Sequence, residues 1–375
     1  MNDPFAADLL ARLPFTVGKV ALLRPSRIGD FICASPALRA LHMALPSAAI
    51  TMITLPLLSE LAERSPYLDR VVPFPGYPGL AEQFFEPRRT AEFFVAMQRE
   101  RFDLAIQMQG SGVYSNPFTL MLGARVTAGF VRPGDGPGRL DAALPFPADE
   151  HEVRRVLALT TFLGAPPRGD GLNLQLRADD HAAAARLLNG AAAPLIGLHT
   201  GARDRTRRWP TERFAATALS LRRRFGGTIV VVGDSHEEEA AGLIERQAGD
   251  GTVNLAGRSG LAVLGAVIAR LAVLVTNDSG PAHMAYALRT PAVVIFGGGS
   301  PRLNGPLDGG PHRILEHPVP CRPCGYTSCP IGYPCLHGLS VERVVGAVEE
   351  IIRASDGTAR ASGSWRGESN VHPWH

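Results

Sequence analysis

Short apolar runs alternate with amphipathic segments along most of the chain. In the first half these runs are rich in valine, isoleucine and leucine, and the segments between them have the periodicity of helices with one apolar face. The strands predicted here are Val20–Leu23, Ile50–Ile53, Val71–Phe74, Leu104–Gln107 and Val126–Phe130, and the helices are 30–44, 57–63, 89–100 and 116–122. Strands that alternate with helices indicate a parallel sheet covered on both faces, which is the α/β class.

The same alternation begins again after a break in the middle of the chain. Residues 132–147 are rich in glycine and proline and predict a loop, 151–164 predict a helix, and 165–171 predict a linker. Beyond it the predicted strands are Leu195–His199, Thr228–Val232, Val253–Leu255, Val273–Thr276 and Ala292–Phe296, and the helices are 212–225, 236–248, 261–271, 281–288 and 341–354. We therefore expect two doubly wound domains, residues 1–165 and 166–354, followed by a disordered tail, 355–375.

Charge and hydropathy exclude several classes of protein. The net charge is only +3 over 375 residues and no dense basic block is present, which argues against a nucleic-acid-binding protein. The N-terminus lacks the basic start and apolar core of a signal peptide. The most apolar stretch, 261–275, is interrupted by Arg270 and is too short to span a bilayer. We expect a soluble cytoplasmic protein, and a peripheral contact with the inner membrane stays open.

The most informative motif is VLVTNDSGPAHM, residues 273–284. It predicts a buried strand that turns at once into a helix, with Asp278 or Ser279 as the cap and Pro281 in the first turn. The first turn of such a helix has unpaired backbone N–H groups and the positive end of the helix dipole, so it can bind a pyrophosphate. An ordinary capped junction between strand and helix is the alternative interpretation.

Three other loops between a strand and a helix contain candidate polar groups. Asp30 could take a proton from an attacking hydroxyl, or it could simply cap its helix. Arg207, in the loop 199–214, could hold phosphate oxygens as they gain charge, or it could be a solvated loop residue. Glu237 follows the strand 228–232 and could accept hydrogen bonds from ribose hydroxyls, or it could compensate the dipole of its own helix.

Four of the five cysteines lie in one short segment, CRPCGYTSCPIGYPC. They are Cys321, Cys324, Cys329 and Cys335. Four thiolates in a segment rich in proline and glycine could bind a structural zinc or iron ion. However, zinc ribbons have two well-separated C-x-x-C pairs, and the spacing here is tighter, which favours reduced thiols in a packed loop. Cys33 stands alone and is expected to be a small core residue.

Taken together, these loops resemble those of glycosyltransferase family 9, the bacterial heptosyltransferases. The resemblance runs from about Val17 to the last predicted helix and lies in LLRPSRIGDFICASPALRAL, GLHTGARDRTRRWPTERF and DSGPAHMAYAL, in the order and spacing of the family. It implies the GT-B fold, in which two Rossmann-like domains face a central cleft. It also implies an inverting transfer of a heptose or related sugar from an ADP-sugar donor to a hydroxyl of a glycan or lipopolysaccharide core acceptor. No cofactor or catalytic metal is required for that transfer.

The resemblance also implies roles for particular residues. Asp30 matches the general base, and Arg207 matches a position where the family often has a phosphate-binding lysine. The donor-binding positions are Thr200, Gly201, Arg207, Glu237, Asp278, Ser279, Gly280 and His283. The candidates for acceptor binding, in the N-terminal domain, are Arg27, Arg88 and Arg89.

Two alternative functions stay open at this point. A transferase of the same fold could use another nucleotide sugar or modify a protein, and assays with ADP-, UDP- and GDP-sugars would separate these cases. A catalytically inactive metal-binding or assembly protein could also retain the fold. The presence of Asp30, Arg207, Asp278 and His283 argues against that loss of activity.

Overall fold

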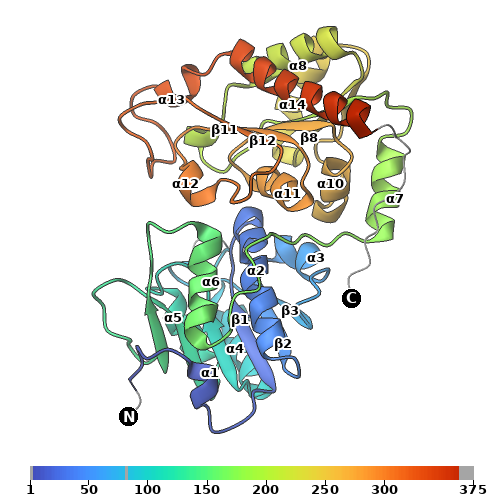
Figure 1. Ribbon diagram of the computed structural model, residues 1–375. Helices are drawn as coiled ribbons and strands as arrows, with labels where there is room; N and C mark the ends of the chain where they lie inside the picture. The colour runs from blue at the N-terminus through green and yellow to red at the C-terminus, as the bar shows by residue number, and fades with distance from the viewer. Residues whose placement is uncertain (1–2, 81–82, 363–375) are drawn as a thin grey trace.

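The computed structural model describes residues 3–80 and 83–362 and contains two parallel six-stranded sheets, one above the other in Figure 1. The N-terminal sheet has the strand order β3-β2-β1-β4-β5-β6. Its strands are β1 (Lys19–Leu23), β2 (Ala49–Thr54), β3 (Arg70–Pro73), β4 (Leu104–Gln107), β5 (Val126–Val131) and β6 (Ala142–Pro145). The order reverses between β1 and β4, and in open α/β sheets ligands bind beyond the strand ends at such a point.

Alternating side chains of the N-terminal sheet enter two different cores. Val20 and Leu22 of β1 belong to a cluster with α2 and α6, whereas Ala21 and Leu23 belong to a cluster with α4 and α5 on the other face. Both faces are therefore apolar, as a covered parallel sheet requires. The helices of this domain are α1 (Leu9–Arg12), α2 (Ile28–Ala44), α3 (Ser59–Ala62), α4 (Pro87–Glu100), α5 (Ser115–Met121) and α6 (Glu152–Leu163).

The C-terminal sheet repeats the topology, with the order β12-β11-β10-β7-β8-β9 and a reversal between β7 and β10. Its strands are β7 (Leu195–His199), β8 (Thr228–Val232), β9 (Thr252–Asn254), β10 (Val273–Asn277), β11 (Ala292–Phe296) and β12 (His312–Glu316). Its helices are α7 (Ala178–Leu187), α8 (Thr211–Phe225), α9 (Glu238–Ala248), α10 (Leu261–Ile268), α11 (Gly280–Leu288), α12 (Pro301–Asn304), α13 (Pro334–His337) and α14 (Val341–Ser362).

The two domains contact each other directly. One cluster of buried side chains includes Phe31 of α2 together with Met284 and Tyr286 of α11, so the apolar core continues across the junction. At the edge of the junction, Arg64 donates to both carboxylate oxygens of Asp180 on α7 at 2.8 Å. The strand ends of both sheets are therefore held close to each other.

The α/β prediction of two doubly wound sheets is confirmed, and every predicted strand is present with bounds shifted by one residue at most. Two strands were missed. The segment predicted as a loop, 132–147, contains β6, and β12 was also missed. Both are short edge strands with prolines or charged residues, which edges tolerate.

Several helices also differ from the prediction, and the four-residue helices α1, α12 and α13 were not predicted. Helix α7 was not predicted because its alanine-rich sequence has little apolar periodicity. Helix α14 continues to Ser362, past the expected start of a disordered tail at residue 355, and the remaining tail residues lie outside the described residues. Over the described ranges, no helix has the length and apolarity needed to cross a membrane.

Candidate active site

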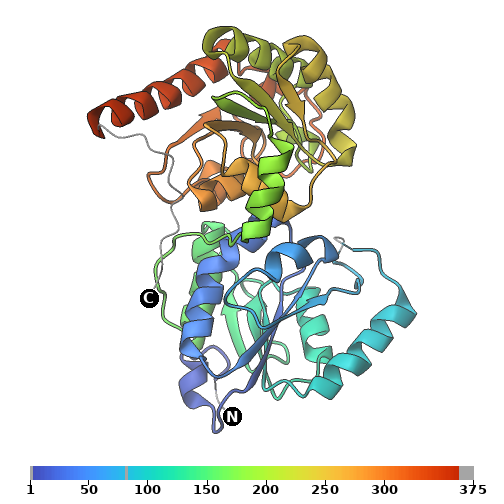
Figure 2. The same ribbon diagram turned by 90° about the vertical axis from the view of Figure 1, so that its right-hand side faces the viewer.

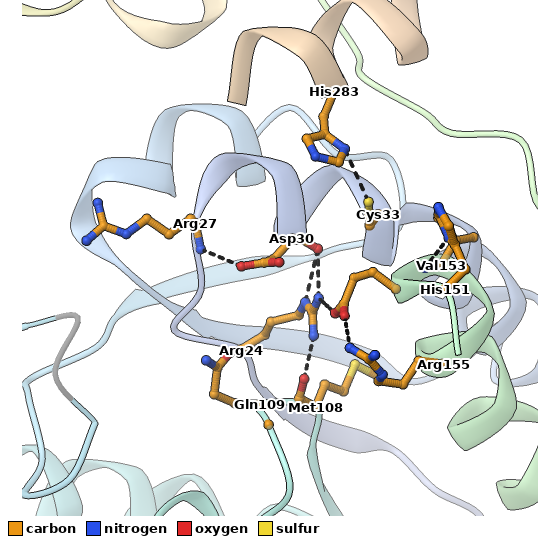
Figure 3. A network of polar contacts seen from close by, with 12 residues as sticks. Arg24, Arg27, Asp30, Cys33, Met108, Gln109, His151, Val153, Arg155 and His283 are labelled. Carbon is orange, nitrogen blue, oxygen red and sulfur yellow. Dashed lines mark hydrogen bonds and ion pairs between the residues drawn. The ribbon is translucent and has the colours of Figure 1, made fainter. Parts of the chain in front are cut away.

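A buried guanidinium organises the loop that follows β1. Arg24 is 2% exposed, and its Nη2 donates to the backbone oxygen of Asp30 at 2.8 Å and to Oε1 of Glu152 at 2.7 Å (Figure 3). A further bond runs from Arg24 to the backbone oxygen of Met108. Burial opposes the charge on Glu152, but Arg24 and Arg155 outweigh it and hold the pKa of that carboxyl below its ordinary value. The network fixes the first turn of α2, where Asp30 lies.

Asp30 is the third residue of α2, and its half-buried carboxylate accepts a hydrogen bond from the backbone N–H of Arg27 at 3.4 Å. The capping interpretation therefore describes part of what this side chain does. Its charge also acts across the domain junction, because it raises the pKa of Asp278 in the C-terminal domain. Asp30 thus lies close to the loops of the opposite sheet.

The starts of α2 and α11 pack tightly against each other. A Cβ on Gly29 would lie 2.5 Å from Cδ2 of His283, and a Cβ on Gly280 would lie 3.0 Å from Cβ of Ile28. One turn further along α2, Sγ of Cys33 lies 3.5 Å from Nδ1 of His283 (Figure 3). Because Gly29 and Gly280 have no side chains, the N-termini of α2 and α11 can pack in direct contact. Burial lowers the pKa of His283 to about 4, so its imidazole is neutral near pH 7.

Asp278 and Arg207 form an ion pair at the end of β10. Nη1 of Arg207, in the short 3-10 turn Arg205–Arg207, donates to Oδ2 of Asp278 at 2.9 Å. Burial and, to a smaller extent, the charge of Asp30 raise the pKa of Asp278 to about 6, although Arg207 opposes the shift. The C-terminal domain therefore has a guanidinium paired with a buried carboxylate whose pKa is affected by the charge of Asp30.

The first turn of α11 has no side-chain cap. Ser279 is its N-cap residue, but the hydroxyl of Ser279 donates to the backbone oxygen of Asn277 at 3.1 Å instead of accepting from the helix. Pro281 has no N–H and the N–H of Ala282 donates to the backbone oxygen of Ser279 at 3.1 Å, so the N–H of Gly280 is the donor left at the positive end of the helix dipole. An anion beside Gly280 would be attracted by this N–H group and by the guanidinium of Arg207, which pairs with the adjacent Asp278.

Asn277 connects the loops on either side of β10, although the sequence analysis gave it no role. Its Nδ2 donates to the backbone oxygen of Thr200 at 2.7 Å, and its Oδ1 accepts from the backbone N–H of Trp209 at 3.0 Å. Both bonds are buried, and Trp209 is also anchored through Nε1 to the backbone oxygen of Leu339 at 3.1 Å. Asn277 therefore holds the loop that contains Arg207 in place.

Glu237 lies beside the loop that follows β7. A Cβ on Gly201 would lie 1.2 Å from its Oε1, and a Cβ on Gly233 would lie 2.2 Å from its Oε2. Nε2 of His199 is 3.4 Å from Oε2 of Glu237, and Nδ1 of His199 is 2.9 Å from Oγ1 of Thr276. Burial opposes the charge of Glu237, but hydrogen bonding and the nearby His199 lower its pKa below the ordinary value. His199 was not among the predicted site residues, although its position at the end of a central strand could have identified it.

The four clustered cysteines do not form a ligand set. Across the described parts of the chain, no group of three or more His, Cys, Asp or Glu side chains is arranged to hold a metal ion. The four thiols are free and differ in their exposure. Cys335 is buried in the core with α13, Cys321 is exposed, and Cys324 and Cys329 are half-buried. The structure therefore does not support a zinc or iron ion at this segment.

The three acceptor candidates are not gathered in one place. Arg27 is exposed at the N-terminus of α2, next to Asp30. Arg88 and Arg89 lie in the exposed first turn of α4, and Arg88 pairs with Glu92 at 3.0 Å. Figure 2 shows α4, in cyan, on the outer flank of the N-terminal domain, away from the junction with the C-terminal domain. Only Arg27 is close to the junction of α2 and α11.

The sequence is similar to a known protein family and to several of its members. A model of glycosyltransferase family 9 (heptosyltransferase) matches residues 90–332, which is more than half of the chain. Lipopolysaccharide heptosyltransferase 2 of Salmonella typhimurium is 28% identical over 308 residues, which cover 77% of this chain and 85% of that protein. The match to lipooligosaccharide heptosyltransferase 2 of Campylobacter jejuni is shorter, with 24% identity over 165 residues, so the chain spans about half (52%) of that relative's length.

The fold is also similar to solved structures. The structure of the Escherichia coli ADP-heptose lipopolysaccharide heptosyltransferase II superposes with a TM-score of 0.73 and 23% identity. The superposition covers 90% of this chain and 99% of that one. This likeness confirms the GT-B arrangement of two Rossmann-like domains.

Proposed function

This chain belongs to glycosyltransferase family 9, the heptosyltransferase family, and we propose that it transfers a heptose from an ADP-linked donor to a hydroxyl of a lipopolysaccharide core acceptor. The observation that carries the proposal is the packing of the start of α2, which contains Asp30, against the start of α11, next to the ion pair of Asp278 with Arg207. A carboxylate from one domain faces an anion-binding helix start on the other. A transferase needs this arrangement to bring an activated sugar to its acceptor.

The C-terminal domain, residues 166–354, binds the donor in this proposal. Its pyrophosphate lies at the first turn of α11, where the N–H of Gly280 and the helix dipole attract negative charge. Arg207 holds a phosphate oxygen with its guanidinium, and Thr200 and Gly201 form the loop on the β7 side. Glu237 accepts the ribose hydroxyls, since its lowered pKa keeps it ionised and the absence of side chains on Gly201 and Gly233 lets its carboxylate lie against the donor loop.

The negative charge that develops on the leaving group can be stabilised without a catalytic metal. Substitution at an anomeric carbon proceeds through an oxocarbenium-like state, and the ADP group gains negative charge as its bond to the sugar stretches. Arg207 and the start of α11 are held in place before the reaction, so they stabilise this charge without reorganisation. Positive charge that a divalent cation would supply is thus provided by the chain itself.

Asp30 acts as the general base that takes the proton from the acceptor hydroxyl. Its backbone is fixed by Arg24, so the carboxylate is positioned by a rigid network and not by a loose loop. Attack from the side of the N-terminal domain, opposite the ADP group, inverts the anomeric carbon. The tight contact of α2 with α11 excludes water, which would otherwise hydrolyse the donor.

The N-terminal domain, residues 1–165, binds the acceptor in this proposal. Arg27 lies three residues before Asp30, and it is exposed and able to meet an anionic glycolipid. Arg88 and Arg89 form a separate basic surface on α4 that contacts the distal part of the acceptor or the cytoplasmic face of the inner membrane.

Donor competition tests the proposal directly. The purified protein is incubated with a lipopolysaccharide core acceptor and with ADP-heptose, a UDP-sugar or a GDP-sugar, and glycosylated acceptor is measured by mass spectrometry. We expect transfer from ADP-heptose alone, and stabilisation of the protein by ADP but not by UDP or GDP in thermal unfolding. Transfer from a UDP- or GDP-sugar, or stabilisation by those nucleotides, would contradict the ADP-sugar assignment.

A further inference from the structure

A groove with a volume of about 600 Å³ lies in the C-terminal domain between the loops that follow β11 and β12. One wall is Gly299–Arg302, and the other contains Glu316, residues 318–320, Arg322 and Pro323. Helix α12, on the first wall, faces the N-terminal domain (Figure 1), and Arg302 of that helix lies 3.8 Å from Asp149 of the opposite domain. The groove therefore opens beside the domain junction.

A charged pair forms the polar part of the groove. The side chain of Arg322 is 10% exposed, and its Nη2 donates to the backbone oxygen of Gly299 at 3.1 Å and to Oε2 of Glu316 at 3.0 Å. Its Nε is buried and has no hydrogen-bond partner among the residues that the structure describes. Glu316 is half-exposed at 49%. The pair thus joins a fixed guanidinium to a carboxylate that a ligand can reach.

The groove is continuous with the donor site. A Cβ on Gly299 would lie 2.2 Å from Oδ2 of Asp278, so the wall of the groove touches the carboxylate that pairs with Arg207. Arg322 is also close enough to Asp278 to lower the pKa of that carboxyl against the effect of burial. A sugar linked to a diphosphate at the start of α11 would lie at the entrance of the groove.

The order of strands separates the two ends of the donor. Glu237 follows β8, on one side of β7 and β10, whereas the groove follows β11 and β12 on the other side. If Glu237 binds the ribose, the diphosphate crosses the start of α11 and the sugar extends toward the groove. The remaining wall consists of Pro318, Val319, Pro320 and Pro323. These side chains pack against the C–H groups of a sugar, and they offer no aromatic ring face on which a nucleobase could stack.

We propose that this groove binds the end of the transferred sugar that is remote from the diphosphate, with Glu316 and Arg322 hydrogen-bonded to its exocyclic hydroxyls. The inference rests on the proposed function, because the groove is assigned to the sugar of that donor. Its consequence is selectivity for sugar length. A donor that lacks the terminal carbon and hydroxyl leaves the two charged groups without their partner.

Kinetics with two donors test the inference. Transfer from ADP-heptose is compared with transfer from ADP-mannose, which is one carbon shorter, for the wild type, Glu316→Gln and Arg322→Lys. We expect each variant to lower the ratio of the two kcat/KM values by about tenfold or more. Affinity for ADP stays unchanged, because the nucleotide lies on the other side of Asp278. Arg353→Lys, at an exposed position of α14, is the matched control and retains the wild-type ratio.

The experiment distinguishes failure of the groove assignment from failure of the proposed function. Glu316→Gln keeps an oxygen that can accept from Arg322, so it preserves the loops even if Arg322→Lys disturbs them. A Glu316→Gln variant that keeps the wild-type preference, or that slows both donors equally, overturns the assignment of the groove while the proposed function stands. A wild-type protein that transfers neither sugar overturns the proposed function and this inference together.

Discussion

Gly29 of α2 lies against the imidazole of His283 on α11, so closely that a Cβ on this glycine would be 2.5 Å from Cδ2 of the ring. The contact joins the two domains at the point where their functional loops meet. Cys33, on the next turn of α2, contacts the same imidazole at 3.5 Å. A larger side chain at position 29 would therefore push α2, and Asp30 with it, away from the donor loops.

Gly29→Ala is expected to separate the two helix starts. Overpacking of a tight contact costs about 1–3 kcal/mol, which corresponds to about 5- to 150-fold in kcat/KM if it acts on the closed state. Steady-state kinetics with ADP-heptose measure the effect, and circular dichroism verifies the fold. Gly346→Ala in α14 is the control, because nothing lies within 4 Å of a Cβ at that position. Wild-type activity in Gly29→Ala would show that this contact does not matter for transfer.

Arg207→Ala is expected to weaken donor binding. Hydrogen bonds to charged groups contribute about 1.5–3 kcal/mol, so the dissociation constant for ADP should rise by about 10- to 150-fold. Arg207→Lys should lose less, since it keeps the charge but not the bidentate geometry. Isothermal titration calorimetry measures the affinities, with exposed Arg205→Ala in the same 3-10 turn as the control. Equal affinities in Arg205→Ala and Arg207→Ala would exclude a specific role for Arg207.

Asp278 is expected to change how stability depends on pH. Its pKa of about 6 in the folded protein lies above its ordinary value of 3.8, so folding favours the protonated form. The stabilisation is complete below about pH 4 and is lost as the pH rises through about 6. Between pH 7 and pH 4, the free energy of unfolding of the wild type should therefore rise by up to about 3 kcal/mol relative to Asp278→Asn. Denaturant unfolding of the nucleotide-free proteins measures this difference, and a flat or opposite trend would contradict the environment described for Asp278.

Asn277→Ala is expected to loosen the donor loops. It leaves the buried backbone oxygen of Thr200 and the N–H of Trp209 without their partners, which costs about 2–4 kcal/mol. The melting temperature and the affinity for ADP should both fall. Asn277→Asp should be no better, because a carboxylate oxygen would face the oxygen of Thr200. Asn189→Ala, in an exposed turn, is the control, and a similar loss in that variant would argue against a specific bridge.

The sequence predicted the central strands well because their signal is local. β10 is a continuous buried run that ends in a turn, and such a run determines a strand without reference to the rest of the chain. β6 and β12 were missed because edge strands need only one paired neighbour and tolerate polar or proline residues. The arrangement of the cysteines was equally hard to predict, since the same spacing is compatible with a metal site or with free thiols of different exposure.

The site was predictable only in part, and for a similar reason. The positions of Asp30, Arg207 and Asp278 after strands could be recognised along the chain. Contacts between the halves could not, because Gly29 and His283 are distant in sequence and neither has a local signal for the other. Arg322 lies between the clustered cysteines, and its sequence gives no sign of a function of its own. Its proximity to Asp278 results from the pairing of β12 with β11 and of β11 with β10.

The central claim is that Asp30 removes the acceptor proton while the opposite domain holds the donor, and Asp30→Asn tests it most directly. Asparagine keeps an oxygen that can accept from the N–H of Arg27, so α2 should fold normally. Single-turnover transfer and calorimetric binding are measured on the same protein with ADP-heptose and acceptor. The account predicts that the affinity for ADP changes less than about threefold while transfer slows by about 100-fold or more. Transfer at the wild-type rate, or loss of nucleotide binding with the loss of transfer, would contradict it.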